Sequence, residues 1–246
     1  MKLLAFLLFI SFANLISSTS QAQTLSIAMD ENFPPYCYIN ESGKPAGIYV
    51  ELLSQMLETN GIKFQFRPLP WARLVSETDQ NTVDISIPWR ATPERFEKYK
   101  MLGPFTHGAG DYYFFAKKTS KATWNSLIDL KGKSIGVVRG FSYPKEFDET
   151  TVLTKEAKND TTTLVKMLVG GRLDFAFSDE IVFKAEMEKQ NIQSQIIKVG
   201  RPLAGTDRYF VVPKEKSELA NKLSKMFELF SKTPEYDRIV RRYISK

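Results

Sequence analysis

The 246-residue sequence contains one cysteine, Cys37, and one histidine, His107. A single cysteine cannot form a disulfide within the chain, so an oxidising compartment would contribute no internal crosslink. Because no cluster of cysteine and histidine exists, we expect no metal site, and we expect no cofactor. One histidine without a nucleophile-elbow motif also argues against a Ser/His/Asp hydrolase.

Strong charge of one sign is also missing. The chain has 34 basic and 28 acidic residues, a formal net charge of +6. The densest basic clusters, Lys117-Lys118 and Arg241-Arg242, are not interleaved with aromatic residues as a nucleic-acid groove requires. We therefore interpret the basic residues as a solvated surface and expect no nucleic-acid partner. The composition otherwise suits one or two globular domains.

The first 22 residues have the form of a secretory signal peptide. Lys2 precedes the apolar run 3–10, and a polar segment ends in the small residues Ser20 and Ala22. The apolar run is too short to span a bilayer and no stop-transfer pattern follows, which argues against a membrane anchor. We expect cleavage near Ala22 and a periplasmic mature protein of residues 23–246.

Hydrophobic periodicity in the first third of the mature chain alternates between strand and helix. The expected elements are a strand at 25–29, a helix from Ile48 that stops at Asn60-Gly61, a strand at 63–67, a helix at 71–77 and a strand at 83–87. This β-α-β-α-β order predicts parallel strands covered by helices.

The same order recurs later in the chain. Strands are expected at 134–138 and 173–177, helices near 161–168 and at 180–190, and then a strand at 209–212 and helices from Glu215 and after Pro234. The repetition predicts an α/β fold with two similar lobes. Ligands usually bind at the carboxyl ends of such strands, so the residues that follow each strand are the candidates for a site.

Three such positions carry suitable chemistry. Thr92-Pro93 predicts a helix start that places Arg95 in the first turn, where its guanidinium can hold a carboxylate through two parallel hydrogen bonds. The turn Gly140-Phe141-Ser142 can offer backbone N–H groups to an anion. Asp179 can accept hydrogen bonds from a cationic ligand group or cap the helix that follows it. The structural alternatives are a surface arginine and a plain turn.

Five motifs occur in an order that resembles a known family. They are Asp30-x-x-Phe33-Pro34-Pro35-Tyr36, Gly47 before a helix, Thr92-Pro93-Glu94-Arg95, Asp129-Leu130-Lys131-Gly132-Lys133-Ser134-Ile135-Gly136-Val137 and Gly171-Arg172-Leu173-Asp174. Together they look like the family 3 extracellular solute-binding proteins, the periplasmic amino-acid-binding components of ABC transporters. The resemblance covers essentially the whole mature chain.

This resemblance implies a type II periplasmic-binding fold, with two α/β lobes joined by a two-segment hinge. Residues 23–108 and 203–246 would form the first lobe and residues 109–202 the second, with His107 as a structural residue near the hinge. It further implies a monomer, not an enzyme, that captures a small polar, amino-acid-like solute and delivers it to an inner-membrane ABC permease.

The resemblance also implies roles for individual residues. Arg95 would bind the α-carboxylate of the ligand and Asp179 its α-ammonium group. In the turn of Phe141 and Ser142, which matches a Gly-Thr-Thr turn, only Ser142 keeps a hydroxyl for further carboxylate contacts. Phe33 would form an apolar wall of the site, and Trp71 is a second candidate for a wall.

One segment departs from the family. Pro88-Trp89-Arg90 stands where typical amino-acid binders have small serine and glycine residues. Proline donates no backbone hydrogen bond, whereas Trp89 would fill space and Arg90 would add positive charge. We count Trp89 and Arg90 among the ligand-binding candidates. An Arg90 that points into the cleft favours an acidic ligand, and one that points outward serves only solvation.

Two other functions remain open on the sequence alone. A periplasmic enzyme similar to cyclohexadienyl dehydratases would need a positioned general acid or base, for which the sequence offers no clear candidate. A ligand-sensing protein would act through a separate membrane receptor.

Overall fold

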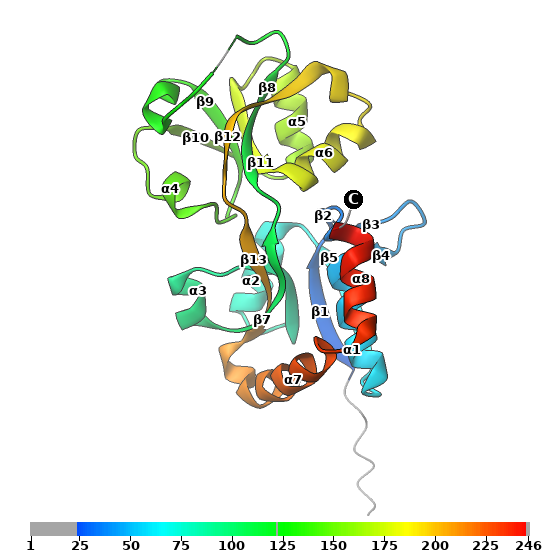
Figure 1. Ribbon diagram of the computed structural model, residues 1–246. Coiled ribbons are helices and arrows are strands. Elements are labelled where there is room, and N and C mark those ends of the chain that lie inside the picture. Colours follow the sequence, from blue (N-terminus) through cyan, green and yellow to red (C-terminus); the bar gives the residue numbers. More distant parts are fainter. Residues whose placement is uncertain (1–23, 122, 245–246) are drawn as a thin grey trace, which may run out of the picture.

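The computed structural model describes residues 24–121 and 123–244, which form two lobes one above the other (Figure 1). The expected signal peptide lies outside these residues. Each lobe is built around one five-stranded sheet. No helix within the described ranges combines the length and apolarity that crossing a membrane requires.

The sheet of the first lobe has the strand order β5-β1-β6-β13-β7. Its strands are β1 (Leu25–Asp30), β5 (Phe64–Leu69), β6 (Ile85–Arg90), β7 (Tyr99–Ala109) and β13 (Thr206–Pro213). The helices of this lobe are α1 (Ile48–Thr59), α2 (Trp71–Asp79), α3 (Pro93–Lys98), α7 (Ser217–Phe230) and α8 (Pro234–Ile244), with a 3-10 turn at Lys214–Lys216. A small sheet of β2 (Asn32–Phe33), β3 (Cys37–Ile39) and β4 (Pro45–Ala46) follows β1.

Successive side chains of β1 point to opposite faces of this sheet, and helices cover both faces. Ile27 and Met29 pack with residues of α1 and α7, whereas Ala28 packs with Trp71 and Leu74 of α2. All are buried. Parallel strands such as β5, β1 and β6 need apolar cover on both faces, and the near-continuous apolar run of β1 provides it.

The sheet of the second lobe has the order β10-β9-β11-β8-β12. Its strands are β8 (Tyr112–Lys117), β9 (Ser134–Val138), β10 (Thr154–Lys158), β11 (Phe175–Asp179) and β12 (Ile196–Leu203). Its helices are α4 (Lys145–Asp148), α5 (Thr161–Val169) and α6 (Glu180–Lys189), with 3-10 turns at Leu127–Leu130 and Gln193–Gln195.

Stacked phenylalanines fill both faces of this second sheet. Phe115 and Phe183 stack at 4.1 Å between ring centroids on the α6 side, and Phe147 of α4 stacks on Phe177 at 4.0 Å on the other. Each lobe therefore has its own buried core, and Val182 of α6 also packs into the core of the first lobe.

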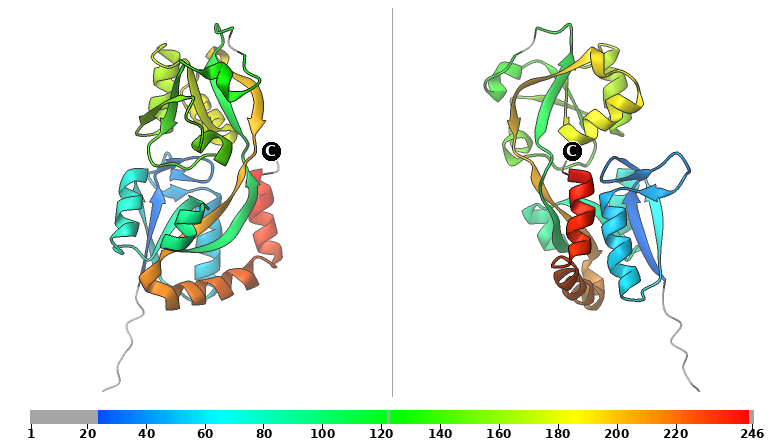
Figure 2. Two further views of the ribbon diagram at one scale, coloured as in Figure 1. Left: turned by 90° about the vertical axis from the view of Figure 1, so that its left-hand side faces the viewer. Right: turned by 45° about the vertical axis from the view of Figure 1, so that its right-hand side comes forward.

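Two connections join the lobes. The chain passes from β7 to β8 and returns from β12 to β13, and the views of Figures 1 and 2 show these long strands running together between the sheets. Gly110 lies in the first connection at φ +62°, and a Cβ there would sit 2.2 Å from Oδ2 of Asp179. The backbone N–H of Gly205 in the second connection donates to Oδ1 of Asp111 in the first, at 2.9 Å.

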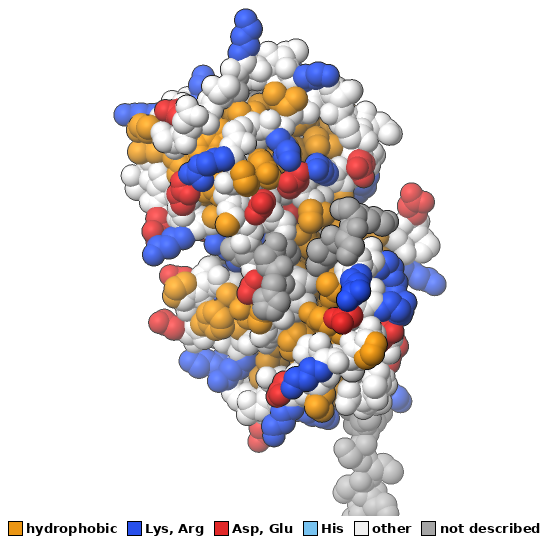
Figure 3. Space-filling model, viewed as in Figure 1, with side chains coloured by type: hydrophobic (Ala, Val, Ile, Leu, Met, Phe, Trp, Pro, Cys, Tyr) orange, Lys and Arg blue, Asp and Glu red, His pale blue; other side chains and the backbone are white. Residues whose placement is uncertain are grey.

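The end of the chain packs on the first lobe, where α8 lies against α1 (Figure 1). Arg242 pairs with Glu51 at 2.7 Å, and the hydroxyl of Tyr236 donates to the carbonyl of Phe105 at 2.8 Å. On the face drawn in Figure 3, acidic and basic side chains are interspersed over both lobes.

The expected elements are present with shifted ends, and one shift bears on the site. The strand expected to end at Ile87 continues through Arg90, because β13 pairs with it as Tyr209 opposite Trp89 and Arg208 opposite Arg90. Sequence periodicity did not reveal this extension, since a proline interrupts it and the partner strand comes from the far end of the chain.

Gly47 immediately precedes helix α1 and allows the chain to approach the carbonyls of residues 35 and 36 closely. The helix has no side-chain cap; the carbonyls of Pro35 and Tyr36 accept its first N–H groups, from Ile48 at 3.1 Å and Tyr49 at 3.0 Å. Gly47 has φ +114°, and a Cβ there would lie 2.5 Å from the Tyr36 oxygen.

We expect Gly47→Ala to lower the free energy of unfolding, measured by urea denaturation, by clearly more than Gly61→Ala. Gly61 also has a positive φ, +65°, but a Cβ there meets nothing within 4 Å, so its loss should be ~1–2 kcal/mol. Equal losses in the two variants would contradict the close approach at Gly47.

Candidate ligand-binding site

A small cavity of about 20 Å³ lies between the lobes, large enough for about one water molecule in this arrangement. Its lining is made by Asp30, Phe33, Trp71, Pro88, Arg90, Arg95, Tyr112, Phe141, Ser142 and Arg208. The structure thus brings together all the candidate residues from the sequence except two, Trp89 and Asp179.

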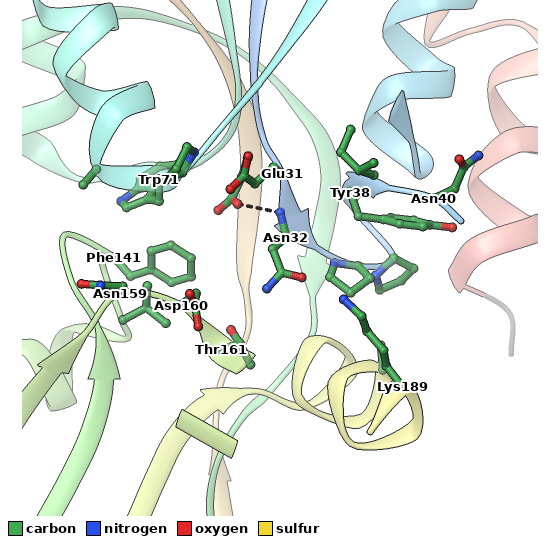
Figure 4. A pocket seen from close by; sticks show the side chains of 18 of the residues that line it. Glu31, Asn32, Tyr38, Asn40, Trp71, Phe141, Asn159, Asp160, Thr161 and Lys189 are labelled. Carbon is green, nitrogen blue, oxygen red and sulfur yellow. Dashed lines mark hydrogen bonds between the residues drawn. The ribbon is translucent and has the colours of Figure 1, made fainter. Parts of the chain in front are cut away.

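A larger groove of about 1290 Å³ adjoins this cavity and shares Asp30, Trp71 and Phe141 with it. In Figure 4, Trp71 and Phe141 lie close together on one part of the groove wall, and Tyr38 and Lys189 lie on another part. The shared residues therefore separate the cavity from the groove.

Phe141 is the main contact of the second lobe with the aromatic residues of the first. Its ring meets Phe33 edge-on at 5.6 Å and Trp71 edge-on at 5.2 Å. The turn after β9 carries it, and Ser142 follows on the cavity wall. The predicted turn thus contributes an aromatic ring as well as a hydroxyl.

Arg95 reaches both lobes from the first turn of α3, whose cap Thr92 accepts a hydrogen bond from the Arg95 N–H at 3.3 Å. Its Nη1 donates to the carbonyl of Arg90 at 2.9 Å, and its Nη2 donates across the cleft to the carbonyl of Gly140 at 3.2 Å. The guanidinium also lies over the ring of Trp89 at 4.7 Å. Burial lowers the pKa of Arg95 to about 10, so it stays charged at neutral pH.

Arg90 lines the cavity from the last position of β6. Its Nε and Nη1 atoms are buried and have no hydrogen-bond partner among the residues that the structure describes. The indole Nε1 of Trp71 is also buried and has no hydrogen-bond partner among the described residues. Burial lowers the pKa of Arg90, and nearby Arg208 lowers it further. Unpartnered buried donors are costly, which marks this wall as a place for an acceptor.

Asp179 and Arg208 form a buried ion pair beside the cavity. Nη2 of Arg208 lies 3.3 Å from Oδ2 of Asp179 and donates to the hydroxyl of Tyr112 at 2.8 Å. Asp179 is 2% exposed and also accepts from the N–H groups of Ile181 and Val182, at 2.9 and 3.2 Å. Burial raises the pKa of Asp179 to about 6, against the lowering effect of Arg208 and these N–H donors. The carboxylate therefore caps α6 and holds a cation of the protein.

Trp89 also stands behind the cavity wall. It is 1% exposed, donates from Nε1 to the hydroxyl of Ser86 at 2.9 Å, and packs against Trp71 at 4.8 Å. Its place is in the core on the α2 side of the sheet, where it supports Arg95 and Trp71. Side-chain contacts of His107, on β7, are outside the described structure.

The cavity contains Asp30, Tyr112 and Arg208, which sequence reasoning did not select. Asp30 stood in a family motif without an assigned role. Arg208 lies in β13, next to the apolar stretch that predicted a strand. A charged residue at the edge of such a stretch could have indicated a site residue. Tyr112 gave no such signal, because an aromatic residue in a strand usually belongs to a core.

Asp30 is buried at the end of β1 and accepts a hydrogen bond from the N–H of Asn32 at 3.0 Å. Burial raises its pKa to about 7, and the nearby carboxylates of Glu31 and Asp160 add to the rise. Within the described ranges, no group of three or more histidine, cysteine, aspartate or glutamate side chains is placed to hold a metal ion.

The Asp179–Arg208 pair can be tested by stability. Arg208→Met leaves a buried carboxylate without its cation, so we expect a loss of about 3–5 kcal/mol in the free energy of unfolding. The matched control Arg242→Met breaks the exposed pair with Glu51 and should cost at most about 1 kcal/mol. Similar losses in urea denaturation would contradict a structural role for the buried pair.

The raised pKa of Asp30 predicts a pH dependence of stability. Between pH 4 and 7 the folded state keeps a proton that the unfolded state releases, so this group makes stability fall as pH rises. The substitution Asp30→Asn should remove that component, which has a slope of at most ~1.4 kcal/mol per pH unit. Exposed Glu188→Gln serves as the control. An unchanged difference between wild type and Asp30→Asn from pH 4 to 8 would contradict the shift.

Residues 25–246 match the bacterial extracellular solute-binding proteins, family 3. The L-cystine-binding protein TcyJ of Escherichia coli K12 is 26% identical over 74% of this chain and 69% of its own length. A putative ABC transporter arginine-binding protein 2 of the same organism is 23% identical, over 93% and 94%.

A solved structure of an ancestral arginine-binding protein bound to glutamine superposes with a TM-score of 0.79. It is 26% identical and covers 91% of this chain and 98% of its own. The two-lobe periplasmic-binding fold expected from the motifs is thereby confirmed, as is the resemblance itself. The chain belongs to family 3 of the bacterial extracellular solute-binding proteins.

Proposed function

We propose that this protein captures a small polar solute with a carboxylate, an amino acid or a related acid, between its lobes in the periplasm and delivers it to an inner-membrane ABC permease. The observation that carries this proposal is the position of Arg95, which lines the cavity and donates to one carbonyl in each lobe. A carboxylate can take both donors of one guanidinium in parallel.

The same position links ligand binding to the movement of the lobes. Arg95 belongs to the first lobe, and Gly140, whose carbonyl accepts a hydrogen bond from it, belongs to the second lobe. A carboxylate bound to Arg95 would replace this carbonyl and meet the Phe141–Ser142 turn beside it. Phe33 and Trp71 supply the apolar walls. In this proposal the protein acts as a monomer and binds one ligand in its cleft.

The relatives support capture and delivery rather than catalysis. Those compared above are named as binding proteins for cystine and arginine, the latter a putative component of an ABC transporter. Both ligands carry an α-carboxylate, which Arg95 suits.

Asp30 favours one second candidate, a periplasmic enzyme of the dehydratase kind. It lies on the cavity wall with a pKa raised to about 7, which is the range of an effective general acid or base at neutral pH. Incubation with prephenate-like cyclic carboxylates, followed by product detection, separates the two: turnover that Asp30→Asn abolishes supports the enzyme.

Binding can be tested with purified protein. A panel of amino acids and small carboxylates is first screened by thermal shift, because a compound bound only by the folded state raises the melting temperature. The affinity for the best compound is then measured by calorimetry. We expect Arg95→Gln to weaken it at least about thirtyfold, since breaking a buried charged hydrogen-bonded pair costs about 2–5 kcal/mol.

The matched control is Arg172→Gln, which removes an exposed arginine of the second lobe outside the cavity. It should leave the affinity within twofold of wild type. An Arg95→Gln protein that binds as tightly as wild type would refute the assigned carboxylate site.

A further inference from the structure

Two arginines face each other at the hinge side of the cavity. Arg90 ends β6 and Arg208 stands directly opposite it in β13, and both line the cavity. Like charges directly opposite each other in an antiparallel pair are destabilising. With Arg95 on the same wall, three guanidinium groups surround a space of about 20 Å³. Such an arrangement needs negative charge nearby.

The carboxylates of the protein supply only part of that charge. Asp179 pairs with Arg208 alone among these arginines. Asp30 lies on the same wall, but its hydrogen bond goes to Asn32, and burial, Glu31 and Asp160 raise its pKa. Asp148 is exposed and accepts from the N–H of Tyr143. Arg90 and Arg95 therefore lack a carboxylate partner at hydrogen-bond distance within the described ranges.

The lining residues Arg90 and Trp71 also leave hydrogen-bond donors without partners. Three buried atoms of its lining residues, Nε and Nη1 of Arg90 and Nε1 of Trp71, are donors without a partner among the described residues. A ligand that matches them brings acceptors. An ammonium group brings only donors and a further positive charge, so it fits this part of the wall poorly.

The carboxylate that would receive an ammonium group is already occupied. Oδ1 of Asp179 accepts from Ile181 and Val182, and Oδ2 accepts from Tyr36 at 3.4 Å and from Arg208. Asp179 is also absent from the cavity lining. The guanidinium of Arg208 thus stands between this carboxylate and the cavity, where a ligand cation would otherwise be needed.

We propose that the ligand is a compact dicarboxylate without an ammonium group, which binds one carboxylate on Arg95 and the other on Arg90, while Arg208 takes the place of the ligand cation beside Asp179. This inference rests on the proposed solute-binding function and names its substrate class. Two carboxylates satisfy the unpartnered donors of Arg90 and offset the charge of two guanidinium groups.

The test uses ligands matched in carbon number. Dicarboxylates from malonate to adipate are compared by calorimetry with aspartate, glutamate, glutamine, arginine and cystine, and with straight-chain monocarboxylates of equal length. We expect at least one dicarboxylate to bind at least tenfold more tightly than the amino acid of the same length, such as succinate over aspartate or glutarate over glutamate.

Variants then assign the second carboxylate. Arg90→Gln should weaken the best dicarboxylate at least tenfold and change the monocarboxylate of the same length by less than threefold, because only the dicarboxylate uses Arg90. Arg172→Gln is the control and should alter neither. Equal weakening of both ligands by Arg90→Gln would show a general structural effect and overturn the assignment.

The outcomes separate this inference from the proposed function. Tighter binding of an amino acid than of its matched dicarboxylate overturns the inference and leaves solute capture intact. Absence of binding by every amino acid and carboxylate in the series contradicts both.

Discussion

The ion pair between Arg208 and Asp179 links the main parts of this structure. Arg208 comes from the strand that returns to the first lobe, and Asp179 ends a strand of the second lobe and caps its helix α6. Tyr36 of the first lobe and Gly110 of the connection both approach the same carboxylate. A charge buried this deeply needs its partner. This one contact therefore affects the position of the lobes, the path of the connections between them and the charge of the cavity.

Around this pair, the apolar cores inside the lobes differ from the contacts between the lobes. Each lobe fills both faces of its sheet with aliphatic and aromatic side chains. The contacts between lobes are different in kind. They combine polar and apolar groups: the buried Arg208–Asp179 pair, hydrogen bonds of Arg95 and Asn32, the edge-on ring of Phe141, and Val182 packed into the core of the first lobe.

Much of the architecture could be predicted from the sequence. Alternating strand and helix periods indicated two α/β lobes, and Thr92-Pro93 placed Arg95 correctly in the first turn of α3. The family resemblance led to Phe33, Phe141 and Ser142, which line the cavity together with the second wall candidate, Trp71. The positions of these residues could be predicted because helix caps, turns and strand ends depend on neighbouring residues in the sequence.

The sequence by itself determined the order of the elements, the amphipathic helices and the family to which the chain belongs. Only the tertiary structure decided what faces the cavity. The extension of β6 to Arg90 exists because β13 pairs with it, and this register puts Arg208 opposite Arg90 and beside Asp179. Whether Asp179 was available to a ligand, and whether Arg90 pointed into the cleft, depended on strands distant in the chain. Register and burial arise from long-range pairing, which no local pattern encodes.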